Sequence, residues 1–172
     1  MHGFTHTRPV SSSLVSFLLG HVDEMAGLDT RETATRLVHG QRILTELFGV
    51  SVKGFLPPAW RMGCVDLALA EACNLEFLVG YHWLQYRAQQ RLSLMTTSWD
   101  WGPIAAFGRL GPALARMQRP TINRLAVIAL HPCDEERGYL SDAIDEIKKL
   151  LDHGYAPTTF DNILKRLPCE TS

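Results

Sequence analysis

The run Leu125-Ala-Val-Ile-Ala-Leu130 decides the fold class of this sequence, and it stops at His131-Pro132. It is a continuous apolar run of the length of a strand. A run without polar alternation is typical of a strand buried on both faces, as in a parallel sheet. We therefore expect an α/β fold with a mostly parallel sheet, and chemistry where its strands end and its loops begin.

The segments around this strand alternate between helical and strand patterns. The clearest helix spans 30–48, between an N-cap at Asp29 or Thr30 and the terminating Gly49. Another helix runs from a capping serine at 141 to 154, and its apolar stripe consists of Ile144, Ile147, Leu150 and Leu151. The other expected elements are helices at 64–73 and 104–117 and strands at 50–56, 75–79, 91–96 and 155–160.

Composition places the chain among ordinary globular proteins. Its 172 residues suit one domain, and a content of 46% apolar and 20% charged residues excludes the class of disordered acidic or basic tail proteins. Lys plus Arg number 17 against 18 acidic residues, a net charge of -1, so we expect no nucleic-acid partner. No apolar run approaches the roughly 20 residues that cross a bilayer, and no signal peptide is present, so we expect a cytoplasmic chain without a membrane partner. The 4 cysteines form no C-x-x-C pair and are expected to be reduced.

Three histidines are candidates for metal binding and proton transfer. His2 and His6 are four residues apart, so on a helical turn both imidazoles share one face and can hold a divalent ion such as zinc. Paired histidines near a terminus are also often plain surface residues. His131 ends the apolar strand, and an imidazole, with an ordinary pKa of about 6.5, exchanges protons near neutral pH. It can equally serve only to fix its loop, and Asp134 can either orient it or cap the following turn.

Tryptophans mark two candidate binding segments. Pro57 and Pro58 stiffen the loop before Trp60, because each proline fixes its own φ and restricts the residue before it. Such a loop can hold Trp60 against a ligand, although a core tryptophan after a turn has the same pattern. Trp99 and Trp101 suit the faces of sugar rings, or else join helices as an apolar contact.

Four segments occur in a recognisable order: His2-Gly-Phe-Thr-His6, Glu24-Met-Ala-Gly-Leu28, Gly54-Phe-Leu-Pro-Pro-Ala-Trp60 and Ala129-Leu-His-Pro-Cys-Asp134. Together they resemble the ordered motifs of polysaccharide deacetylase-like proteins, in particular a branch with HGYTH-like, GF-x-x-P-x-W and HP-x-D motifs. The segment 152–160 also resembles the end of such a domain. The resemblance spans nearly all of the chain, as one domain over residues 1–172.

This resemblance implies a partial, distorted (β/α) barrel lacking its first strands. It also implies metal-dependent removal of acetyl groups from a carbohydrate substrate. In the family's scheme, a divalent metal on one Asp and two His activates a water, an aspartate acts as the base, and a late histidine protonates the leaving amine. By position, His2 and His6 correspond to the metal pair. His131 corresponds to the late acid. Three further residues correspond to the substrate groove: Pro58, Trp60 and Trp101.

The sequence departs from the family at its first motif, an Asp-Asp pair that should precede the histidine pair. The carboxylate ligand and the base are then both missing. Asp23, Glu24 and Asp29 are candidates to approach the metal, but no spacing requires it. Leu56 also stands where better-known members carry an arginine. We expect an N-terminally truncated domain with impaired activity and with His2 on a frayed chain end. We also expect either that a partner or a second copy of the chain covers the open barrel edge, or that the true start lies upstream.

Two alternatives stay open beside the metal-dependent hydrolase. The first is a catalytically inactive remnant or glycan-binding module that keeps the groove around Trp60, Trp99 and Trp101. The second is a thiol hydrolase that uses Cys133 with His131. It is disfavoured because residues two positions apart rarely converge as nucleophile and base.

Overall fold

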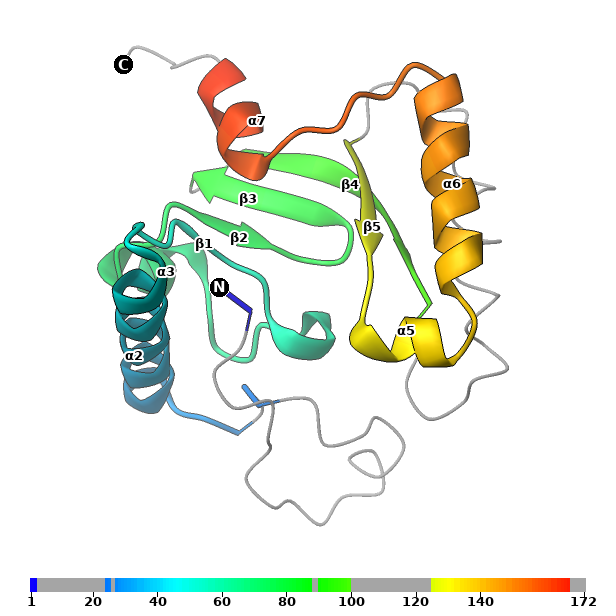
Figure 1. Cartoon of the computed structure of the whole chain (residues 1–172). Helices are drawn as coiled ribbons and strands as arrows, with labels where there is room; N and C mark the ends of the chain where they lie inside the picture. Colours follow the sequence, from blue (N-terminus) through cyan, green and yellow to red (C-terminus); the bar gives the residue numbers. More distant parts are fainter. Residues whose placement is uncertain (3–23, 26, 88–89, 100–124, 168–172) are drawn as a thin grey trace. The chain divides into compact units, whose positions relative to one another are not determined.

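The computed structural model describes residues 1–2, 24–25, 27–87, 90–99 and 125–167 (Figure 1). The chain divides into two compact units, Met1–Ala129 and Leu130–Ser172. The described part of the first unit is a sheet with two α-helices and a 3₁₀ turn, and the described part of the second unit is helical. No helix among the described residues is long and apolar enough to span a membrane. The expected helix at 104–117 lies outside the described residues.

The first unit is built on a curled sheet whose five described strands are arranged in chain order. These strands are β1 (Gly54–Phe55), β2 (Phe77–Val79), β3 (Trp83–Arg87), β4 (Gln90–Ser98) and β5 (Leu125–Ala129). The pairs β1–β2 and β4–β5 are parallel, whereas β2–β3 and β3–β4 are antiparallel. The mixed α/β class is confirmed, but the sheet is less parallel than expected because β3 was not anticipated.

Strand β5 confirms the strand that was predicted from the apolar run at 125–130, but its predicted burial needs a correction. The five residues Leu125–Ala129 pair in parallel with Leu94–Ser98 of β4. All five are only half-buried in the structure, not buried on both faces. The described strands that are buried are β1, β2 and the second half of β4, where every residue from Leu94 to Ser98 is buried.

Helix α2 (Thr30–Phe48) has the bounds that the sequence predicted. The Asp29 carboxylate accepts a hydrogen bond from the backbone N–H of Glu32 at 2.7 Å, which satisfies one donor of the first turn. Gly49 ends the helix with φ 66°, a left-handed conformation that favours glycine. The buried residues of the helix are Thr33, Leu37 and Gly40. Strong local signals at both ends explain why the prediction was correct.

Helix α3 (Leu67–Ala72) is shorter than the expected 64–73. It begins late because Asp66 is its N-cap and accepts a hydrogen bond from the backbone N–H of Leu69 at 2.8 Å. Cys73 then closes the helix as its C-cap. Strands β1 and β2 are likewise shorter than the expected 50–56 and 75–79.

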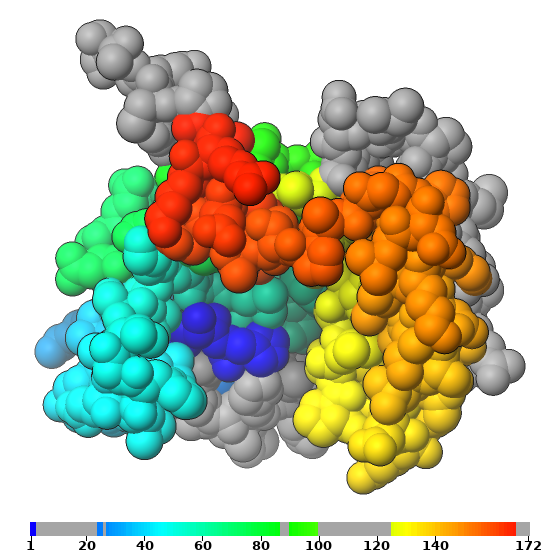
Figure 2. All heavy atoms as spheres, turned by 45° about the horizontal axis from the view of Figure 1, so that its top comes forward, coloured from blue at the N-terminus to red at the C-terminus, as the bar shows by residue number. Residues whose placement is uncertain are grey.

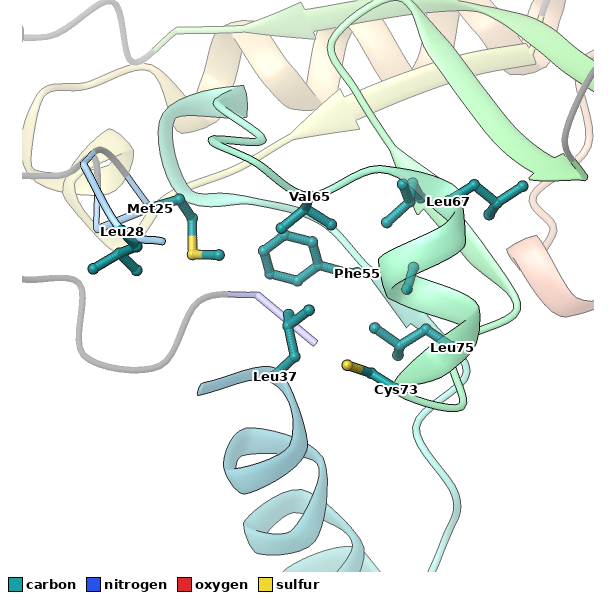
Figure 3. Close-up of a cluster of buried hydrophobic side chains, with 10 residues drawn as sticks. Met25, Leu28, Leu37, Phe55, Val65, Leu67, Cys73 and Leu75 are labelled. Atoms are coloured by element: carbon teal, nitrogen blue, oxygen red, sulfur yellow. The ribbon is translucent and has the colours of Figure 1, made fainter. Parts of the chain in front are cut away.

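The core of the first unit lies between the two helices and the first strands. Phe55, which is 1% exposed, points into a cluster that includes Leu37 of α2 and Val65 (Figure 3). The other fully buried members are Met25, Leu28, Leu67, Ala70, Cys73, Leu75 and Leu78. This cluster holds the ends of β1 and β2 in place.

The second unit contains α5 (Pro132–Glu136), α6 (Leu140–Asp152) and α7 (Phe160–Arg166). Tyr139, not the serine at 141, is the N-cap of α6. The expected strand at 155–160 is wrong, because Thr159 accepts a hydrogen bond from the backbone N–H of Asn162 at 3.2 Å and so starts α7. Most of the apolar stripe of α6 is exposed, with Ile144 43%, Ile147 38% and Leu151 47% accessible.

Candidate functional site

The sheet brings the motif-bearing loops of the first unit to one edge. Strands β1 and β2 are parallel neighbours, so their carboxyl ends lie together. The 3₁₀ turn η1 (Pro58–Trp60) follows β1, and the turn Gly80-Tyr81-His82 follows β2. We call this part of the first unit the carboxyl edge. Ligands of α/β proteins commonly bind outside the carboxyl ends of the strands.

The Met1–His2 segment is held at the carboxyl edge by three hydrogen bonds to the segment around β1, two made by Met1 and one by His2. The Met1 amino group donates to the carbonyl of Gly54 at 2.7 Å, and the backbone N–H of Leu56 donates to the carbonyl of Met1 at 2.9 Å. Bonds on either side of Phe55 are the pattern of parallel strands. The His2 ring nitrogen Nδ1 lies 3.0 Å from the carbonyl oxygen of Leu56. The expected frayed chain end is therefore wrong for these two residues, which lie at the surface (dark blue in Figure 2).

The His2–Leu56 contact selects one tautomer of the neutral imidazole ring. A carbonyl oxygen only accepts hydrogen bonds, so Nδ1 must carry the proton and donate it. In the neutral ring the lone pair is then on Nε2. Histidine metal ligands are usually oriented in this way, with the second ring nitrogen donating to a carbonyl or carboxylate. The ring of His2 thus fits the role of an Nε2 ligand.

The proline loop holds Trp60 in a strained conformation. Ala59 and Trp60 both have positive φ, 52° and 60°, which is uncommon for residues other than glycine. Backbone N–H groups of Trp60 and Arg61 donate to the carbonyls of Pro57 and Pro58 at 3.1 and 3.2 Å, which closes the turn. Pro58 is buried, whereas Trp60 is only half-buried. Trp60 is thus no fully buried core residue, and it remains a candidate for ligand contact.

Two further aromatic residues of the carboxyl edge, Tyr81 and His82, were missed in the sequence. The Trp60 and Tyr81 rings meet edge to face with centroids 5.3 Å apart, and the Tyr81 and His82 rings do so at 4.5 Å. Burial raises the pKa of the Tyr81 phenol. The sequence did contain a signal for them. Tyr81 and His82 follow an apolar strand, just as the proline loop follows β1.

His131 is the N-cap residue of α5 in the second unit. Its backbone N–H donates to Oδ2 of Asp134 at 2.8 Å, and the Asp134 N–H donates back to the His131 carbonyl at 2.9 Å. Asp134, which is 1% exposed, therefore caps this turn, one of its two expected roles. Its Oδ2 also lies 3.7 Å from the ring Nδ1 of His131. Within the described residues, neither that Nδ1 nor Oδ1 of Asp134 has a hydrogen-bond partner.

The remaining sequence candidates divide into three groups. His6 and Trp101 lie outside the described residues. Trp99 is 1% exposed at the end of β4, so it belongs to the core and contributes no open face. Asp29 caps α2, and the described residues contain no group of three or more His, Cys, Asp or Glu side chains that could hold a metal ion. His2 and His131 belong to different units, so the expectation that they act at one site stays a prediction.

A hollow in the first unit lies at the other end of β2. It has a volume of about 560 Å³, is open to solvent, and is lined by Ser51, Glu71, Asn74, Leu75, Glu76 and Tyr86. Glu76 forms an ion pair with Lys53 at 3.4 Å. Asn74 to Glu76 precede β2, so this hollow is at the amino end of the strand. It holds none of the residues of the four motifs, and we assign the candidate chemistry to the carboxyl edge.

Comparison with known proteins adds no family to this description. No protein-family model, no curated protein and no solved structure matches the chain.

Proposed function

We propose that the chain is a metal-dependent, deacetylase-like hydrolase that acts on acetylated carbohydrate. In this proposal, the curled sheet is part of a distorted (β/α) barrel of the polysaccharide deacetylase type. The observation that carries the proposal is the His2 imidazole, which is fixed at the carboxyl edge by the Leu56 carbonyl with its lone pair on Nε2. The same edge carries the proline loop and Trp60.

His2 and His6 are the proposed ligands of a divalent ion, with zinc as the first choice because neutral imidazole suits it. When bound, such an ion polarises an acetyl carbonyl and lowers the pKa of a water molecule. The sequence contains no Asp-Asp pair to supply a carboxylate ligand and a base. We therefore propose that turnover is impaired.

The other proposed roles belong to residues of this chain. His131 donates a proton to the leaving nitrogen or oxygen, and Asp134 holds the start of α5 by accepting the His131 backbone N–H. Pro58 shapes the loop that presents Trp60, and Trp60 with Trp101 contacts the sugar. Contact between an indole face and the C–H face of a sugar ring buries apolar surface from both.

The proposal is tested by metal content and acetate release. The full chain is loaded with zinc or cobalt, and bound metal is measured by mass spectrometry after desalting. We expect roughly one ion per chain, and much less in His2→Ala and His6→Ala. Acetate release from β-1,4-linked N-acetylglucosamine oligomers should be slow, and His131→Ala should lower it further while keeping the metal.

The matched control is His39→Ala, because His39 is an exposed histidine on α2. This variant should keep both the metal and the slow acetate release. If neither His2→Ala nor His6→Ala lowers the metal content, the proposed ligand pair is wrong. Acetate release that is insensitive to added metal would contradict the proposed reaction.

A glycan-binding module without turnover is the second candidate, and the aromatic contacts at the carboxyl edge favour it. Trp60, Tyr81 and His82 reach this edge regardless of whether a base is present. Binding of oligosaccharide without acetate release, with zinc or cobalt present, would support this candidate over the hydrolase.

A further inference from the structure

Helix α6 (orange in Figure 1) exposes a row of apolar side chains, which we call the α6 stripe. Its members, Leu140, Ile144, Ile147 and Leu151, follow one another at intervals of four, three and four residues. Because an α-helix turns by about 100° per residue, this spacing places all four side chains on one face. Each of them is between 38% and 47% exposed, so the apolar face of the helix is accessible.

The buried side of α6 is less apolar than the exposed α6 stripe. The buried residues of the helix are Ala143 and Glu146, which are 0% and 1% exposed. Burial of apolar area is favourable, whereas burial of a carboxylate costs free energy. A helix that only covered its own unit would therefore bury its apolar stripe and leave the carboxylate in water. The reversed arrangement indicates that the α6 stripe contacts a partner.

Both ends of α6 are closed by hydrogen bonds, so its surface is formed before any partner binds. At the first turn, the backbone N–H of Tyr139 donates to the Asp134 carbonyl at 2.8 Å, and the Tyr139 carbonyl accepts the Ala143 N–H at 3.0 Å. At the last turn, the ring Nδ1 of His153 lies 2.6 Å from the carbonyl oxygen of Lys149. A preformed helix loses little conformational entropy on association.

The α6 stripe is complementary to a second copy of itself. Its intervals of four, three and four residues are the same from either end, and they match the a and d positions of two heptads. In an antiparallel pair of α6 helices, Ile144 lies opposite Ile147 of the second copy, and Leu140 lies opposite Leu151. A two-fold axis produces this contact, because the same surface serves both copies.

The charges beside the α6 stripe favour the antiparallel direction. Lys148 and Asp145 form an ion pair at 3.5 Å, with both side chains more than 60% exposed. In the antiparallel pair, Lys148 lies about 3 Å along the axis from Asp145 of the second copy, within reach of its side chain. A parallel pair sets Lys148 beside Ala143 instead, where it meets no opposite charge. The antiparallel pair also aligns the two helix dipoles favourably.

Helix α2 has a face with the same spacing but the wrong charges for self-pairing. Arg31, Thr35, Val38 and Arg42 follow one another at intervals of four, three and four residues, and they line an open hollow of about 480 Å³. An antiparallel pair of α2 helices would set Arg31 against Arg42 of the second copy, and like charges in contact repel. Self-association is therefore expected at α6 and not at α2.

We propose that two copies of this chain form a dimer through antiparallel α6 helices, with Ile144 and Ile147 at its centre. A lipid surface suits α6 less well, because its four acidic residues and two lysines give a net charge of −2, which anionic lipid repels. Four side chains per copy form a small interface, so we expect a reversible dimer with a dissociation constant on the order of tens of micromolar. This dimer does not rest on the proposed function, and its interface is a helix face instead of the expected open barrel edge.

The first test is sedimentation velocity of the full chain between roughly 1 and 300 μM, a range that spans the expected dissociation constant. The parent chain should change from monomer to dimer across this range. Ile144→Lys and Ile147→Lys should each weaken the dimer at least tenfold, or about 1.4 kcal/mol, because the symmetry places the change in both copies. Val38→Lys is the matched control, since Val38 is an apolar residue of α2 that is 52% exposed, and it should leave the dimer unchanged.

The second test reverses the charges beside the α6 stripe. Asp145→Lys and Lys148→Asp each place like charges across the antiparallel pair, so each should weaken the dimer. The double variant Asp145→Lys/Lys148→Asp restores opposite charges and should recover most of the affinity of the parent chain. A double variant as weak as the two single variants would rule out the antiparallel register.

Three results would overturn the α6 dimer. The first is a chain that stays monomeric over the whole concentration range. The second is a dimer that is unchanged in both Ile144→Lys and Ile147→Lys, which would place the interface elsewhere. The third is loss of folded structure in both variants by circular dichroism, which would mean that the chain itself covers the α6 stripe. Binding of the monomer to phosphatidylserine vesicles that is lost in Ile147→Lys would instead assign the stripe to a membrane surface.

Discussion

At the scale of single residues, Tyr81 shows how the carboxyl edge combines packing and chemistry. Its ring contacts Trp60 on one side and His82 on the other. Burial raises the pKa of its phenol above the ordinary 10.0, because the charged phenolate loses hydration. Tyr81 thus stays neutral across the physiological range, and its hydroxyl can both donate and accept a hydrogen bond.

The raised pKa of Tyr81 predicts a loss of stability at alkaline pH. Above the ordinary pKa, the unfolded chain releases this proton while the folded chain retains it, so the free energy of unfolding falls as the pH rises above about 10. Tyr81→Phe should make the decline shallower than in the parent chain. Urea titrations on both sides of this pH measure the effect. Equal slopes in the two proteins would show that Tyr81 ionises as readily when folded as when unfolded.

At the scale of elements, local signals decided which helices could be predicted. Helix α2 has a side-chain cap at Asp29 and a left-handed glycine at Gly49, and both are visible in the sequence. The segment 155–160 was mistaken for a strand, and α7 was not predicted, because Thr159 was not recognised as the cap of this helix. Phe160, Ile163 and Leu164 have the i, i+3, i+4 spacing that favours a helix.

The N-cap of α2 predicts a measurable effect on stability. Asp29→Ala removes the acceptor of the Glu32 N–H and should lower the free energy of unfolding by about 1 kcal/mol. Asp29→Asn keeps an acceptor of similar reach and should cost much less. Urea unfolding followed by circular dichroism measures both changes. An equal loss in the two variants would mean that the charge of Asp29 matters more than its hydrogen bond.

Strand β3 could not be predicted from the local sequence pattern. Trp83-Leu-Gln-Tyr-Arg87 is a strand only because β2 and β4 pair with it on either side. Its antiparallel direction turns an expected mostly parallel sheet into a mixed one. Pairing of this kind depends on partners elsewhere in the chain, and β propensity depends strongly on such context.

At the scale of the whole molecule, the first unit depends on one cluster around Phe55. Phe55 packs against α2, the residues before α3 and the sheet. Its two neighbours in the chain, Gly54 and Leu56, form hydrogen bonds with Met1. The sequence identified His2, Trp60 and His131 as members of its motifs. It could not show that His2 binds the Leu56 carbonyl, because that contact joins residues 54 positions apart.

Phe55→Ala is predicted to destabilise the first unit by about 3–5 kcal/mol, because it leaves a cavity in a fully buried cluster. Phe55→Leu fills most of that volume and should cost far less. Thermal unfolding followed by near-ultraviolet circular dichroism measures both. A loss in Phe55→Ala of less than about 1 kcal/mol would mean that the cluster collapses around the missing ring.

Two glycines that lie beneath aromatic rings should tolerate almost no substitution. A methyl group at Gly54 would overlap the Phe77 ring, and one at Gly80 would overlap the Trp83 ring. At Gly49 and Gly138 the same methyl group would meet open space, and their positive φ values still admit asparagine or aspartate. In a saturation library selected for folding, positions 54 and 80 should therefore remain almost entirely glycine, whereas positions 49 and 138 should accept other residues.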